Sequence, residues 1–232
     1  PGVMKESQNQ TKGVNFNMSY MKDKLIMRAN VSLNESDSRN SPYGSFSQYT
    51  RLNPYYIPED AYGEQQKVLD NNTVSGQSTI ITNPLYDATV GIKDITNSLN
   101  MTTTLGLEYM VLRNLRITEQ LSYSRGMAGT DKFLPADHTS FELEDDLTRK
   151  GSYFKSSGEM ASWSSNLGIN YNLVLGKHLF STFGNWTISQ DRNNYVNLSA
   201  TGYPDAHMDD FIFGYKMETN MSNIGTENIS RS

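Results

Sequence analysis

The sequence predicts an all-β protein: an antiparallel transmembrane β-barrel segment of about six strands in three hairpins, with long extracellular loops, incomplete as a barrel by itself. Three stretches each combine an alternating strand, a turn of a few residues and a second alternating strand. Long polar segments separate the three hairpins. Short connections at one end of the strands and long ones at the other are typical of barrels of the bacterial outer membrane.

Each predicted hairpin has one apolar and one polar face. In the first hairpin, for example, Val14, Phe16, Met18 and Tyr20 alternate with Asn and Ser residues. A period of two places the apolar residues on one side of a strand and the polar residues on the other. The three hairpins span residues 14–34, 99–123 and 163–190, and turn at Lys22-Asp23-Lys24, Arg113-Asn114 and Gly176-Lys177.

Glu119 is the exception in the second hairpin, because it falls on the apolar side. The cost of a lipid-facing carboxylate falls to ~0–1 kcal/mol near the membrane–water interface. We therefore expect Glu119 to lie near an edge of the apolar band.

A soluble β-sandwich would also alternate, and two details favour the membrane barrel. The polar faces contain Asn, Ser and Thr with few charges, whereas sheets that face water usually carry Lys and Glu. Aromatic residues gather near the strand ends, as they do at membrane–water interfaces. These residues are Tyr20, Tyr109 and Tyr171 before the short turns, and Tyr123 and Trp163 near the long connections.

The composition excludes several classes of protein. The 232 residues carry a formal net charge of -5, which gives no support for a nucleic-acid partner. Cysteine is absent, so disulfides and thiolate metal sites are excluded. The mean hydropathy is -0.59 and no run approaches the ~20 apolar residues of a membrane helix, which excludes a helical membrane protein.

The long connections are predicted from Glu35 to about Lys93, from Gly126 to about Gly158, and from Asp191 onward. Structureless connections of this length usually carry function. In a barrel they are the extracellular loops, and the short turns face the periplasm. Six strands cannot close a bacterial barrel, which needs about eight, so we expect residues 1–232 to be an internal part of one larger barrel.

Several loop segments resemble the SusC/RagA-like outer-membrane transporters. The order and spacing of these segments carry the resemblance over most of the chain, and they would cover about a quarter of a full-length member, with the plug domain and the remaining strands absent. The segments are Ser41-Pro42-Tyr43-Gly44-Ser45-Phe46, Leu52-Asn53-Pro54-Tyr55-Tyr56, Asn83-Pro84-Leu85-Tyr86-Asp87-Ala88, Phe133-Leu134-Pro135-Ala136-Asp137-His138-Thr139-Ser140-Phe141 and Ala200-Thr201-Gly202-Tyr203-Pro204.

The resemblance implies a TonB-dependent receptor of the bacterial outer membrane that imports oligosaccharides or peptides. It also implies a SusD-like surface lipoprotein as a lid, TonB as a partner through an N-terminal part that this chain lacks, and lipid around the barrel. Neither a cofactor nor a metal is expected.

Three sets of loop residues could carry chemistry. His138 lies near Asp131, Asp137 and Ser140, but no nucleophile elbow or oxyanion loop accompanies them, so we expect solvated loop residues and predict no enzyme. The acidic clusters at residues 142–146 and 205–210 match no defined calcium loop and are expected to be solvated.

The third set is the aromatic first loop. Aromatic faces suit stacking on sugars or packing on a partner protein, and they equally suit packing of the loop on itself. We expect Tyr49, Tyr55 and Tyr56 to contact substrate or lid, with packing within the loop as the alternative. A binding or adhesion barrel without transport is the alternative function, and an outer-membrane enzyme that uses Ser140 and His138 is a third possibility.

Overall fold

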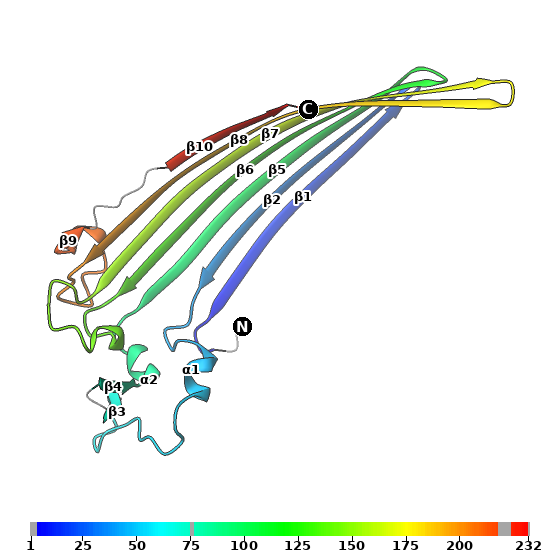
Figure 1. The fold of residues 1–232 in the computed structure, drawn as a ribbon. Coiled ribbons are helices and arrows are strands. Elements are labelled where there is room, and N and C mark those ends of the chain that lie inside the picture. Colours follow the sequence, from blue (N-terminus) through cyan, green and yellow to red (C-terminus); the bar gives the residue numbers. More distant parts are fainter. Residues whose placement is uncertain (1–3, 75–76, 218–223, 232) are drawn as a thin grey trace.

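The computed structural model describes residues 4–74, 77–217 and 224–231. One large antiparallel sheet dominates it, and the loops and short helices gather at one end of the strands (Figure 1). The strand order is β1-β2-β5-β6-β7-β8-β10, with β9 paired to the end of β8 and β3-β4 as a separate pair. The sheet is not closed, so the predicted fold class, an incomplete antiparallel barrel segment, is confirmed.

The six long strands form the three predicted hairpins. They are β1 (Gln8–Lys22), β2 (Leu25–Arg39), β5 (Lys93–Leu112), β6 (Leu115–Leu134), β7 (Ser152–Leu175) and β8 (His178–Thr201). The remaining elements are β3 (Val68–Val74), β4 (Gln77–Thr82), β9 (Lys216–Met217), β10 (Ile224–Arg231), α1 (Phe46–Thr50), α2 (Pro84–Asp87) and the 3-10 helices η1 (Thr139–Phe141) and η2 (Phe211–Phe213).

Two-residue turns close the three hairpins at the predicted places. Lys22 pairs with Leu25, Leu112 with Leu115, and Leu175 with His178. Asp23 has a φ of 53° and Gly176 a φ of 62°, the positive values that tight hairpin turns with right-handed strand twist require.

The strands run much further into the predicted loops than expected. Residues 35–39, 126–134, 152–158 and 191–201 were predicted as connections, and the structure places them in strands. The alternation of apolar and polar residues stops there because the side chains on both faces are largely polar. The backbone ladder does not depend on side-chain polarity, so it continues as long as the neighbouring strand is present.

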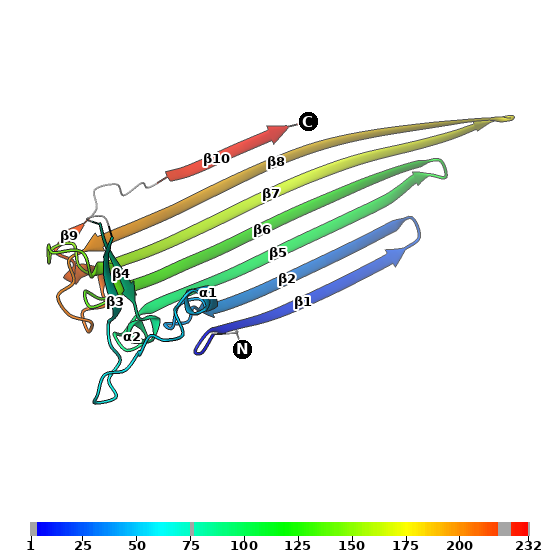
Figure 2. The same ribbon diagram turned by 60° about the horizontal axis from the view of Figure 1, so that its bottom comes forward.

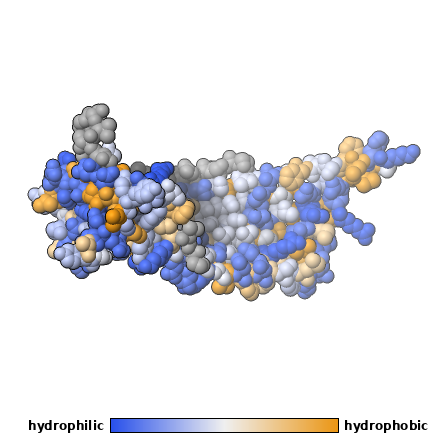
Figure 3. Space-filling view, turned by 90° about the horizontal axis from the view of Figure 1, so that it is seen from below, coloured by the Kyte–Doolittle hydropathy of each residue, from blue (hydrophilic) through white to orange (hydrophobic). Residues whose placement is uncertain are grey.

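The register brings most of the apolar residues in the middle of the six long strands onto one face, called the apolar face. Near the turns, Val174, Leu179 and Phe183 lie on the opposite side. One row across the strands consists of Tyr20, Met27, Leu107, Glu119, Leu167 and Trp186. The opposite side, called the polar face, has a row of Asn17, Asn30, Thr104, Ser122, Ser164 and Ser189. Figure 3 shows one side of the molecule, where blue and white cover much of the middle of the sheet and orange groups lie both towards the turns and at the loop end.

Charged residues bound the apolar band on the strands. On β1 the band occupies residues 13–21, between Lys12 and Lys22, and on β2 it occupies residues 25–34, between Lys24 and Glu35. This is the length of about 9–11 residues that a tilted strand needs to cross a bilayer. Lys12 and Glu35 face each other across the two strands with their charged atoms 3.7 Å apart.

Successive hairpins are displaced along the strand direction (Figure 2). Met110 N donates to Lys24 O at 2.9 Å, so the second turn lies several residues beyond the first. Asn172 N donates to Asn114 O at 2.9 Å, which places the third turn beyond the second in the same direction. A constant displacement of this kind is what strand tilt produces in a barrel wall.

Two features of the apolar face bear on the predictions. Tyr123 and Trp163 pair directly across β6 and β7, as an aromatic belt requires, and Trp163 Nε1 donates to Gln190 Oε1 at 2.9 Å. The placement of Glu119 near an edge was wrong. Glu119 pairs with Leu167, four residues from the Tyr123–Trp163 pair and four residues from the Leu115–Tyr171 pair. It therefore lies midway between the two aromatic ends of the band.

A small aromatic core lies at the loop end of the sheet. Phe133, Tyr153, Ala200 and Tyr203 are buried there, and Phe211 packs against them. Phe133 and Tyr203 meet edge to face with ring centroids 5.2 Å apart. This core fixes the loop after β8 to the ends of β6, β7 and β8.

Candidate functional site: the loop end of the sheet

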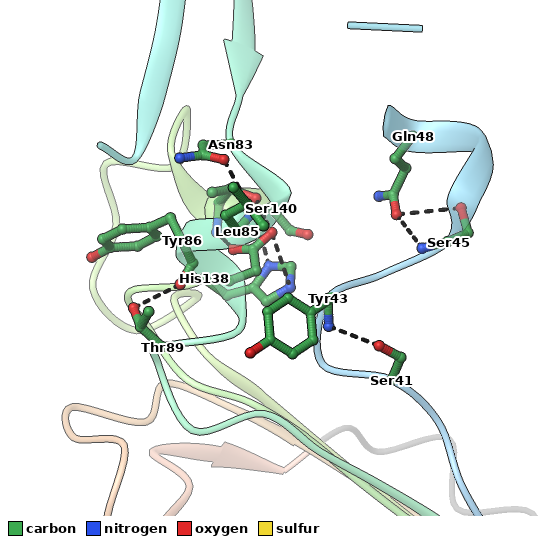
Figure 4. A network of polar contacts seen from close by, with 12 residues as sticks. Ser41, Tyr43, Ser45, Gln48, Asn83, Leu85, Tyr86, Thr89, His138 and Ser140 are labelled. Atoms are coloured by element: carbon green, nitrogen blue, oxygen red, sulfur yellow. Dashed lines mark hydrogen bonds and ion pairs between the residues drawn. The ribbon is translucent and has the colours of Figure 1, made fainter. Parts of the chain in front are cut away.

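The candidate site lies where three loop segments meet at the loop end of the sheet (Figure 4). The first segment contains Ser41 to α1, the second contains α2, and the third contains η1. They enclose a cavity of about 300 Å³. Its lining includes Ser41, Gln48, Asp87, Asp94, Lys132, His138 and Ser140.

Side-chain caps shape the first segment. Ser45 precedes α1, and Gln48 Oε1 accepts a hydrogen bond from Ser45 N at 2.6 Å, which completes a capping box. Ser41 Oγ accepts from Tyr43 N at 3.1 Å (Figure 4). Short polar side chains at these positions satisfy backbone donors that a loop would otherwise leave unpaired.

Asn83 anchors the second segment. Its Oδ1 accepts from Leu85 N at 3.0 Å and so caps α2, and Pro84 occupies the first helical position, where no N–H is needed. Its Nδ2 donates to Pro58 O at 3.1 Å and to Gln66 O at 2.8 Å. The segment beginning Asn83-Pro84 therefore ties the long first connection to the base of the loops.

Asp87 joins the second segment to the third. Its carboxylate accepts hydrogen bonds from Thr139 N at 2.9 Å and from Thr139 Oγ1 at 2.7 Å, and both residues are buried. Hydrogen bonds to a charged acceptor are the strong kind, and a buried carboxylate needs them. This contact fixes η1 against α2.

His138 contributes to the same contact in a neutral form. Ser140 N donates to His138 Nδ1 at 3.0 Å, so the neutral ring carries its proton on Nε2, which lies 3.7 Å from Asp87 Oδ2. Burial lowers the pKa of His138, the Asp87 carboxylate opposes this shift, and Lys132 and Lys67 reinforce it. Ser140 meets the imidazole through its backbone N–H, whereas a catalytic triad would need its hydroxyl there.

The three tyrosines predicted to contact substrate or lid occupy different environments. Tyr49 is half-buried, and its hydroxyl donates to Tyr43 O at 2.7 Å. The Tyr56 hydroxyl donates to Asp70 Oδ2 at 3.1 Å. Tyr55 is 88% exposed. Tyr49 and Tyr56 thus hold the loop together, and Tyr55 offers its ring to the solvent.

Further exposed apolar side chains surround Tyr55 in the sequence. Phe46, Ile57 and Tyr62 are exposed in the same first connection, and Leu143 and Leu147 are exposed in the connection after β6. Large apolar side chains held open on ordered loops are typical of surfaces that bind a partner.

The acidic clusters form ion pairs with nearby bases. Glu142 pairs with Lys67 at 2.7 Å, Arg149 lies 3.8 Å from Glu144 and 3.7 Å from Asp146, and Asp209 lies 3.8 Å from Lys93. Asp205 accepts a hydrogen bond from His207 N at 2.7 Å. Within the described residues, no group of three or more His, Cys, Asp or Glu side chains has the arrangement of a metal site.

Two features of the site were not predicted from the sequence: the Asp87–Thr139 contact, and Lys132 as part of the cavity lining. Asp87 and Thr139 are 52 residues apart, and neither residue type signals a partner at that distance. Lys132 lies on the polar face, 3.8 Å from Asp94 across β5 and β6. Lys132 fell in the connection predicted from Gly126 to about Gly158, where no pattern in the sequence singled it out.

The fold is that of a stretch of antiparallel barrel wall with its loops at one end. Among solved structures, the chain is similar to "Structure of the RagAB peptide transporter", at 14% sequence identity and a TM-score of 0.66, over 97% of this chain and 25% of that chain. The open-open and closed-closed states of the RagAB peptide importer match with a TM-score of 0.67, also at 14% identity. The chain thus spans about a quarter of the length of these structures.

The likeness establishes a shared fold with a peptide importer. No protein-family model matches the chain, and no curated protein matches it. None of the helices in the described ranges is both long and apolar enough to cross a membrane.

Proposed function

We propose that this chain forms part of the barrel wall and the outer loops of a TonB-dependent importer in the bacterial outer membrane, related to the SusC/RagA-like transporters. One observation carries the proposal. The apolar band on the first hairpin has the length of a bilayer crossing and lies on a sheet with the fold of a RagAB segment. In this arrangement, lipid covers the apolar face and the polar face lines the lumen.

The open edges of the sheet support membership of a larger barrel, with residues 1–232 as part of one barrel domain. Among the residues that the structure describes, β1 pairs with β2 alone, and β10 covers β8 only from Ile188 to Tyr195. Unpaired backbone groups are costly in lipid, so further strands have to continue the wall on both sides.

Peptides are the favoured ligands, because the solved structures with this fold are a peptide transporter and importer. Oligosaccharides remain the second ligand class, as the resemblance of the loop segments implies. The exposed Tyr55 and its apolar neighbours suit contact with a SusD-like surface lipoprotein. No bond-making step is assigned to the chain, because Ser140 meets His138 through its backbone.

Uptake by cells that make the full-length protein tests this proposal. Labelled peptides should accumulate in the periplasm of cells with an active TonB system and stay outside cells that lack TonB. Surface binding that is unaffected by TonB, without accumulation, would instead support the adhesion alternative.

A further inference from the structure

Three charged residues meet on the polar face near the hairpin turns. Arg28 on β2, Glu108 on β5 and Arg116 on β6 lie on three successive strands. Arg28 Nη1 is 3.7 Å from Glu108 Oε2, and Arg116 Nε is 3.5 Å from Glu108 Oε1. Two guanidinium groups therefore share one carboxylate, and the cluster carries a net charge of +1 at neutral pH.

The two guanidinium groups keep most of their binding capacity. Their side chains are 63% and 54% exposed, whereas the Glu108 side chain between them is only 20% exposed. Both contacts to Glu108 are longer than good charge-assisted hydrogen bonds, which measure about 2.7–2.9 Å. Among the described residues, no hydrogen bond is donated by either guanidinium, so their planar N–H edges are open to a ligand.

A hollow of about 470 Å³ adjoins Arg28 on this face. Gly106 lies on its floor, directly opposite Arg28 in the register, and supplies no side chain to fill it. The polar side chains around it are Asn17, Ser19, Arg28, Asn30, Thr104 and Gln120. Amides and hydroxyls next to an open guanidinium make a surface that can take an anionic group and hydrogen-bond the polar atoms around it.

The cluster is the cationic part of an otherwise neutral wall. On the polar face of the six long strands, the other charged residues are the Asp94–Lys132 pair at the loop end and Asp191 on β8. Asp94 and Lys132 balance each other, and Asp191 adds a negative charge. An anion that enters along this face would therefore find its positive charge at Arg28 and Arg116.

We propose that Arg28 binds the carboxylate of a small solute in the hollow beside Gly106, such as the C-terminal carboxylate of a short peptide. Arg116 lies outside the hollow and supports the site by sharing Glu108, which leaves Arg28 free for the solute. The guanidinium fork matches a carboxylate in two parallel hydrogen bonds, which an amide cannot reproduce. Glu108 holds the two arginines towards each other and competes with the solute. The proposal rests on the proposed function, because a solute reaches this face only if the face lines a lumen.

Two probes test it on the full-length protein in lipid nanodiscs: N-acetyl-trialanine with a free C-terminal carboxylate, and the same peptide as a C-terminal amide. Saturation-transfer NMR measures the binding of each. The acid should bind about tenfold more tightly than the amide. Competition by acetate, which carries the same group without a peptide, should displace the acid.

The variants separate this site from general electrostatic attraction. R28Q should abolish the preference for the acid and R116Q should reduce it, whereas E108Q should increase it because the internal competitor is neutralised. R39Q is the matched control, since Arg39 lies on the same strand but on the opposite face and should leave the preference unchanged.

Equal binding of acid and amide, or binding of neither, overturns the carboxylate proposal. The proposal also fails if R28Q and R116Q lower the stability of the barrel without changing the preference, since the cluster would then be occupied by polypeptide. TonB-dependent uptake is measured separately, so the import function survives any of these outcomes.

Discussion

Glu119 accepts a hydrogen bond from Ser165 Oγ at 2.7 Å in the middle of the apolar face, flanked by Leu107 and Leu167 in the same row. The Ser165 hydroxyl is the one hydrogen-bond donor that the described residues offer to this carboxylate. A single hydroxyl leaves most of the carboxylate's acceptor capacity unmet. Glu119 is therefore a weak point in a surface that otherwise suits lipid.

We expect Glu119→Leu to stabilise the protein in a bilayer. If lipid covers the apolar band as proposed, removing a carboxylate from its centre should raise the free energy of unfolding by about 1–2 kcal/mol, because glutamate at this depth costs somewhat less than the ~2–4 kcal/mol of a base. Urea unfolding in lipid vesicles measures the change, with Glu159→Leu beyond the band as the control. A loss of stability would mean that Glu119 has a protein partner in place of lipid.

Neighbouring residues on β5 test which face meets lipid. Leu105→Lys should lower the free energy of unfolding in vesicles by about 2–4 kcal/mol, because Leu105 lies in the middle of the apolar band. Thr104→Lys, at the same depth on the polar face, should change it by less than about 1 kcal/mol. Equal costs for the two lysines would contradict the assignment of the faces.

The Asp87–Thr139 contact should hold the loops together. Asp87→Ala leaves Thr139 N and Oγ1 without their acceptor in a buried place, and we expect a loss of about 1–3 kcal/mol in the local free energy of opening. Hydrogen exchange at the Thr139 amide reports it directly. Asp145→Ala, a change at an exposed carboxylate, is the control and should leave that amide protected.

The docking of η1 should weaken in acid. Because the pKa of His138 is lowered in the folded state, the opened loop binds a proton more readily than the docked loop as the pH falls through about 6.5. Stability is thus fully present above that pH and is lost below it. Limited proteolysis of residues 135–151 at pH 7.5 and pH 5 measures this, and His138→Gln should flatten the dependence. Tighter docking at pH 5 would show that attraction between His138 and Asp87 outweighs burial.

Tyr55 and Tyr49 should respond differently to substitution. Tyr55→Ala removes an exposed ring and should weaken capture of the ligand or lid by about five- to tenfold without loss of stability. Tyr49→Phe removes only the hydrogen bond to Tyr43 O and should cost about 0.5–1.5 kcal/mol of loop stability with capture preserved. Surface plasmon resonance with the purified lipoprotein and thermal unfolding measure the two effects.

The alternation of apolar and polar residues predicted the middle parts of the strands, where one face of the sheet is apolar. The alternation from Val14 to Tyr20 gave the correct strand and the correct face, because one face had to be apolar. It could not predict that β7 continues to Ser152, since beyond Glu159 neither face needs to be apolar. The depth of Glu119 was also out of reach, because it depends on how β6 aligns with β7.

The contacts in the loops and on the polar face were likewise predicted only in part. The segment beginning at Asn83 stood out in the sequence, and its role as a clamp became visible only with its partners at Pro58 and Gln66. The contact between Asp87 and Thr139 and the cluster around Glu108 join residues on separate elements. The cluster depends on how β2 aligns with β5, two strands that no short turn connects, and the Asp87–Thr139 contact depends on how two long connections fold against each other.

The length of β6 and β7 beyond the Arg125–Glu159 ion pair has a mechanical consequence. At about 3.3 Å per residue, residues 126–134 carry the loops roughly 30 Å along the strands beyond this ion pair. A ladder of paired strands is stiff over such a distance, so the loops are attached to a rigid extension of the sheet. If the loops move relative to the wall, the chain must therefore bend at the strand ends, near Leu134 and Ser152, and the wall below stays undisturbed.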